Sequence, residues 1–147
     1  MLYAGTSLPI PRKEWDRTAP GISVRSLVNA ELPIREFFSK PEIQEIGSTS
    51  GCGCDFAFAM FQNGEWPLPI GDERDEETIE SKRFNQHALL SLLKSIDEHS
   101  IELYGIWANN YEASPRVRET IDLERIVDAG FFFKEEGFLT VRLRRSL

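Results

Sequence analysis

The chain has little of what several large classes of protein require. It has two cysteines and two histidines in 147 residues, and it contains no N-x-[ST] glycosylation acceptor. No apolar run approaches the eighteen or more residues of a membrane-spanning helix. The N-terminus also lacks the basic region and the long apolar stretch of a secretory signal. We therefore expect a soluble protein of the reducing cytoplasm that has no membrane partner.

Two catalytic motifs are each incomplete by a critical residue. The segment Gly47-Ser48-Thr49-Ser50-Gly51 nearly matches the G-x-S-x-G nucleophile elbow, but its central residue is Thr49. A phosphate-binding P-loop requires a lysine, and none occurs between Lys40 and Lys82. We interpret the glycine and serine run as a tight turn between two strands. Successive amides can also form a nest for an anion, which is the open alternative.

What the chain does contain is typical of a single globular domain, 1–147. It is 41% hydrophobic and 28% charged, with ten phenylalanines, which argues against disorder. Its net charge is −7, and the acids are densest over residues 72–77. Because this charge would repel a phosphate backbone, we expect no nucleic-acid partner. The acidic segment favours a basic protein partner instead.

Both cysteines lie in one short segment that the sequence predicts to be a strand over 52–62. Cys52, Cys54, Phe56, Phe58 and Met60 recur at every second residue, so an extended chain places all five on one face. The cysteines then continue an apolar stripe, and structural packing is the favoured interpretation because free cysteine behaves as a small hydrophobe.

The same segment is the candidate functional site, which comprises Cys52, Cys54, Asp55 and His87. A metal site that uses Cys52 and Cys54 is a weaker alternative, because a tetrahedral metal needs four ligands and the chain offers only two histidines besides carboxylates. A redox couple is the third alternative, although the spacing differs from Cys-x-x-Cys. We predict no cofactor.

A further hypothesis is a hydrolase in which two neighbouring carboxylates catalyse the reaction. Which two carboxylates lie together depends on the fold. The candidate acids are Asp55, Glu65, Asp72 and Glu112.

The pattern of elements predicts an α+β fold with a mainly antiparallel sheet of about five or six strands. The clearest element is a long helix, about 76–98, in which Leu89, Leu92, Leu93 and Ile96 follow the i, i+3, i+4, i+7 pattern. One or two short helices are expected, one beginning near Pro33 and one over 123–129. The other predicted strands are a short opening strand and the segments 21–28, 42–46, 101–107 and a hairpin of 131–133 with 138–143.

The motif Gly47-Ser48-x-x-Gly51-Cys52-Gly53-Cys54 resembles one found in a group of small uncharacterised bacterial proteins. The resemblance implies a bacterial, single-domain protein, and the group brings no activity with it.

Two functional hypotheses follow. We favour a non-enzymatic binding or interaction protein, because no catalytic set in the sequence is complete. The alternative is a metal- or thiol-dependent small enzyme centred on Cys52, Cys54 and Asp55, with His87 as its helper. The sequence predicts no oligomeric state.

Overall fold

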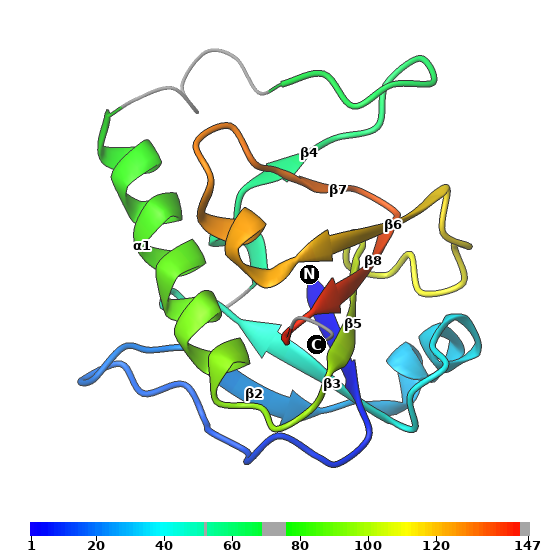
Figure 1. Cartoon of the computed structure of the whole chain (residues 1–147), viewed down its shortest axis with the longest axis horizontal. Coiled ribbons are helices and arrows are strands. Elements are labelled where there is room, and N and C mark those ends of the chain that lie inside the picture. The colour runs from blue at the N-terminus through cyan, green and yellow to red at the C-terminus, as the bar shows by residue number, and fades with distance from the viewer. Residues whose placement is uncertain (52, 69–75, 145–147) are drawn as a thin grey trace.

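The computed structural model describes residues 1–51, 53–68 and 76–144, without the side chains of residues 54, 76 and 77. Over these residues the fold is α+β, as predicted: a six-stranded, mostly antiparallel sheet carries one main helix (Figure 1). The strands lie in the order β2-β3-β1-β5-β8-β6. Their bounds are β1 Leu2–Thr6, β2 Ser23–Ser26, β3 Glu42–Gly47, β5 Ser100–Gly105, β6 Val117–Asp122 and β8 Gly137–Arg142. A separate pair consists of β4 Phe58–Ala59 and β7 Phe133–Lys134.

Both faces of the large sheet are covered. Side chains alternate between the faces, so Leu2 and Ala4 join one core cluster while Tyr3 joins the other. The helix α1 (Glu76–Lys94) and the 3-10 helix η4 (Leu123–Val127) cover the first face. The 3-10 helix η1 (Asn29–Phe37) covers the second (Figure 1).

The helices differ from their predicted bounds at the ends. α1 ends at Lys94, four residues before the predicted end, because the chain tightens there: the N–H of Ile96 donates to the Leu93 carbonyl at 3.2 Å, an i to i−3 bond. The short helix predicted to begin near Pro33 begins instead at Asn29 and carries Pro33 inside it.

The predicted strand over 52–62 is wrong for most of its length. Residues Gly53–Asp55 form a turn of 3-10 helix, η2, and only Phe58–Ala59 are strand. Phe56 and Ala57 are both buried although they are consecutive, so the period of two does not hold. Gly53 lies against β1, where a Cβ atom would stand 2.8 Å from the Leu2 nitrogen, and this close approach bends the segment away from a ladder.

The predicted hairpin of 131–133 with 138–143 is also wrong. Its two arms belong to different sheets, because β7 pairs in parallel with β4 whereas β8 pairs with β5 and β6. The ring of Phe133 packs against Phe56, Phe58 and Phe131, which draws the first arm toward β4.

The strand β6 was not predicted. It lies at the edge of the sheet and runs parallel to β8, and a parallel pair requires a crossover connection. That connection consists of η4, the segment 128–132 and β7. The crossover places residues 126–132 beside α1, where the cleft described below is found (Figure 1).

Candidate functional site

In the loop that carries the predicted site, the described residues 47–51 and 53–55 contact neighbouring segments. The loop begins with the predicted tight turn, in which the Gly51 N–H donates to the Ser48 carbonyl at 2.9 Å, but the 3-10 helix η2 follows where a second strand was predicted. Gly51 has a φ of +93°, a conformation that favours glycine. The indole of Trp15 covers Gly51 and donates from Nε1 to the Thr49 carbonyl at 2.9 Å.

Asn85 joins this loop to α1. Its side chain is fully buried, and its Oδ1 accepts hydrogen bonds from the Thr49 N–H at 2.9 Å and from the Thr49 hydroxyl at 2.7 Å. Its Nδ2 donates to the Ser81 carbonyl at 3.0 Å and, at 3.5 Å, to the Asp55 carbonyl. One amide therefore holds both ends of the cysteine-bearing loop.

The structure does not describe all of the predicted site residues. Cys52 lies outside the described residues, and so does the side chain of Cys54, whose backbone belongs to η2. Asp55 is half-buried and contacts Asn85 through its carbonyl. The packing, metal and thiol interpretations of the two cysteines therefore stay predictions.

His87 points away from this loop. It is exposed, and it follows Asn85 by two residues, which is about 200° around the helix at 3.6 residues per turn. Because Asn85 faces the loop, His87 faces solvent on the other side of α1. Among the described residues, no group of three or more histidine, cysteine, aspartate and glutamate side chains is arranged to hold a metal ion.

The candidate acids of a hydrolase lie on different segments. Glu65 is exposed and bridges to Gln62 at the end of a hairpin turn, whereas Glu112 is exposed in the loop after β5. Asp72 lies outside the described residues. The pairing hypothesis for these acids stays untested.

The structure does pair two other carboxylates, those of Glu31 and Glu45. Arg25 donates from Nη1 to Glu31 at 2.7 Å and from Nε to Glu45. Burial raises the pKa of Glu45 more than Arg25 lowers it. Burial also opposes ionisation of Glu31, but the hydrogen bond from Arg25 is among those that together outweigh it and hold the pKa of Glu31 low. Because Glu31 is 1% exposed and Glu45 6%, the pair is enclosed, and we assign it to the fold.

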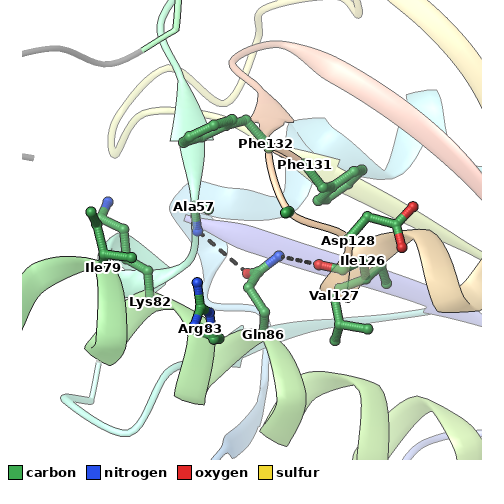
Figure 2. A pocket seen from close by; sticks show the side chains of 12 residues that line it. Ala57, Ile79, Lys82, Arg83, Gln86, Ile126, Val127, Asp128, Phe131 and Phe132 are labelled. Atoms are coloured by element: carbon green, nitrogen blue, oxygen red, sulfur yellow. Dashed lines mark hydrogen bonds between the residues drawn. The ribbon is translucent and has the colours of Figure 1, made fainter. Parts of the chain in front are cut away.

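A cleft separates the N-terminal half of α1 from residues 126–132 (Figure 2). We name it the α1–η4 cleft, and its cavity measures about 280 Å³. Ligand pockets span roughly 300–1,000 Å³, so this cavity suits a small ligand or part of a larger one.

The base of the cleft is held by Gln86, whose side chain is 5% exposed. Its Oε1 accepts from the Ala57 N–H at 3.3 Å, and its Nε2 donates to the Ile126 carbonyl at 3.0 Å (Figure 2). One side chain thus joins α1, the segment before β4 and the end of η4. These bonds fix the three segments that shape the cavity before any ligand binds.

The walls of the cleft are largely apolar. Ile79 stands on the α1 side with 40% of its surface exposed. Phe131 and Phe132, both partly buried, stand opposite. Between them and η4, Gly130 turns the chain with a φ of +83°. An apolar group therefore has surface on two sides of the cavity to pack against.

The charges at the cleft favour an anion. Lys82 and Arg83 both line it, and within the described part of the chain neither forms an ion pair. The acid there, Asp128, already has a partner, because Arg125 lies 3.2 Å from its carboxylate. Two cations that have no ion pair with any described residue thus stand beside apolar walls in a chain of net charge −7.

Sequence reasoning missed these residues, although a signal was present. Ile79, Lys82, Arg83 and Gln86 follow the i, i+3, i+4, i+7 spacing and so form a second stripe on α1, beside the apolar one. Such a stripe mixes apolar, cationic and amide groups, and by composition alone it is typical of a solvated face.

Comparisons with protein-family models, with curated proteins and with solved structures find no match to this chain. Of the helices in the described residues, none combines the length and the hydropathy that crossing a membrane requires.

Proposed function

We propose that this chain is a non-enzymatic binding protein of the bacterial cytoplasm, and that the α1–η4 cleft is its binding site. Its ligand is an anionic group attached to an apolar body. The observation that carries the proposal is the position of Lys82 and Arg83, two cations without ion pairs among the described residues, at a preformed cavity with apolar walls.

The charge of the whole chain strengthens this argument. In an acidic protein a long-range field attracts cations and repels anions, so an anionic ligand binds only where local cations reverse the field. Lys82 and Arg83 provide such a place.

The groups at the cleft suit recognition rather than catalysis. Neither the amide nor the carboxylate at the cleft is free to act on a ligand as an acid or a base. Gln86 uses both ends of its amide in hydrogen bonds to the backbone, and Asp128 is paired with Arg125. What remains free is positive charge and apolar surface, which orient and hold a ligand.

A titration with two small probes tests the proposal. We expect 3-phenylpropionate to shift the backbone amide resonances of residues 79–86 and 126–132 in ¹⁵N-labelled protein. The uncharged 3-phenylpropionamide has the same apolar body, so it should bind more weakly at the same place. Arg83→Gln should weaken binding of the carboxylate by about twofold to fivefold, the usual contribution of a partly exposed ion pair.

The matched control is Lys94→Gln. Lys94 is an exposed cation of the same helix and does not line the cleft, so its removal changes net charge equally without touching the site. Equal binding of the acid and the amide, or shifts scattered over the whole surface, would refute the proposal.

A further inference from the structure

A second hollow adjoins the α1–η4 cleft, and the two share Lys82. We name it the Trp107 hollow. It measures about 110 Å³, and its apolar lining comes from Met1, Phe58, Met60, Ile106 and Trp107. This volume suits one apolar side chain. Trp107 is 56% exposed, so it presents a large apolar surface to solvent beside the hollow.

The lining of the Trp107 hollow is typical of surfaces that bind peptides. Methionine is flexible and polarisable, and it adapts to varied apolar partners. Tryptophan is enriched among the residues that contribute most to binding at protein interfaces. The acid of the hollow, Glu135, accepts a hydrogen bond from the Phe61 N–H at 2.7 Å, so its carboxylate is held there.

The chain at β4 touches both hollows, because Ala57, just before the strand, lines the α1–η4 cleft and Phe58 lines the Trp107 hollow. The carbonyls of Ala57 and Ala59 accept hydrogen bonds from β7, at 2.7 Å from the Phe133 N–H and at 2.9 Å from the Glu135 N–H. Neighbouring residues of a strand direct their backbone groups to opposite sides, so the N–H and C=O of Phe58 point away from β7. An extended chain lying along this side would find a donor and an acceptor there.

We propose that the ligand is an extended peptide segment of a protein partner, which crosses both hollows. One apolar side chain enters the α1–η4 cleft, a second enters the Trp107 hollow, and an aspartate or glutamate between them contacts Lys82. This inference rests on the proposed function and names its ligand class. The inference is based on Lys82, which lines both the α1–η4 cleft and the Trp107 hollow. A peptide with a carboxylate between two apolar side chains matches this arrangement of one cation between two apolar sites.

The experiment uses fluorescein-labelled seven-residue peptides that carry a central aspartate and a leucine two or three positions away on each side. Binding to the full chain is followed by fluorescence anisotropy. The comparison peptides replace the aspartate with asparagine or one leucine with serine. We expect the asparagine peptide to bind about twofold to fivefold more weakly, and each serine peptide to bind about tenfold more weakly.

Protein variants assign the two apolar contacts. Trp107→Ser should weaken the parent peptide about tenfold or more and leave 3-phenylpropionate binding in the α1–η4 cleft unchanged. Lys82→Gln should abolish the preference for aspartate over asparagine, whereas Lys94→Gln should retain it. If Trp107→Ser folds poorly, Met60→Gln replaces it. This variant also changes the lining of the Trp107 hollow, and we expect the same result from it.

The outcomes separate the two proposals. If 3-phenylpropionate binds as expected but the peptides show no dependence on Trp107 and Met60, the peptide inference is wrong and the binding site stands. If neither probe binds, both are wrong. If native mass spectrometry instead finds that the wild type is a dimer and that Trp107→Ser is a monomer, a second copy of this chain occupies the Trp107 hollow, and the peptide inference is wrong.

Discussion

At the scale of single residues, Glu31 and Glu45 are two buried glutamates whose pKa values move in opposite directions. Both contact Arg25, yet burial moves the pKa of Glu45 above its ordinary value, whereas the pKa of Glu31 is held below its ordinary value. The contributions of these two carboxylates to stability therefore depend on pH with opposite sign, although both contact one guanidinium. A variant that is only less stable in general would not produce this opposite dependence on pH, so the two glutamates can be tested separately.

For Glu45 a raised pKa in the folded state means that its contribution to stability is present at low pH and is lost as the pH rises. Glutamine resembles the protonated side chain and does not ionise. The stability of the wild type relative to Glu45→Gln should therefore fall as the pH rises from about 4 toward 7. Urea unfolding at each pH measures the difference, and a difference that grows over this window would contradict the assignment.

For Glu31 the sign is reversed, and Glu31→Gln is the matched comparison. A lowered pKa in the folded state contributes stability above the ordinary glutamate pKa, and this stability is lost as the pH falls through the folded value. The stability of the wild type relative to Glu31→Gln should shrink from about pH 5 to about pH 3. Parallel slopes for the two variants would mean that Arg25 does not distinguish the two carboxylates.

At the scale of elements, the loop of residues 47–55 depends on α1 for its shape. The side chain of Asn85 accepts hydrogen bonds from Thr49 and donates one to the Asp55 carbonyl. This side chain is fully buried. Replacing it leaves backbone groups of the loop without partners. Each buried polar group left unpaired costs about 1–3 kcal/mol.

We therefore expect Asn85→Leu to lower the free energy of unfolding by about 2–4 kcal/mol, and the Thr49 amide to exchange its proton with solvent much faster. Thr49→Val is the partial variant, because it removes only the hydroxyl bond and should cost about 1 kcal/mol. Urea unfolding and hydrogen exchange measure the two effects. A loss below about 0.5 kcal/mol for Asn85→Leu would show that the loop holds its shape without α1.

The elements that the sequence predicted are those whose signals are local. The opening strand Leu2–Thr6 and the strand Glu42–Gly47 are present. The turn at Asn63-Gly64 is equally local: its φ values are 50° and 81°, and both residues tolerate positive φ. Each depends on side-chain alternation or turn chemistry within a few residues.

The elements that the sequence did not predict depend on distant partners. The segment 53–57 departs from a strand where Asn85 and β1 contact it, and neither is near it in the chain. In the edge strand β6 three of the six side chains are exposed and none is fully buried, so it has no clear apolar alternation to detect. The α1–η4 cleft exists only because a crossover brings residues 126–132 to α1, some forty residues away in sequence.

At the scale of the whole molecule, one sheet lies between two core clusters. Ile126 of η4 belongs to the cluster on the α1 side, and Ile34 of η1 belongs to the cluster on the opposite side. Both are almost fully buried, at 1% and 0% exposure. Since the large sheet lies between the two clusters, loss of packing on either face should unfold the same sheet. A single cooperative transition is therefore expected.

The pair Ile126→Val and Ile34→Val tests this cooperativity, because the same methylene group is removed on each face. Each variant should lower the free energy of unfolding by about 0.5–1.5 kcal/mol, and the double variant should lose the sum to within about 0.5 kcal/mol, because the two sites share no contacts. Urea unfolding is followed by tryptophan fluorescence and by far-ultraviolet circular dichroism. In a single unit the two signals give one midpoint in every variant. Midpoints that separate in Ile126→Val alone would mean that the α1 side, with its cleft, unfolds before the rest, and that ligand binding there would stabilise only part of the molecule.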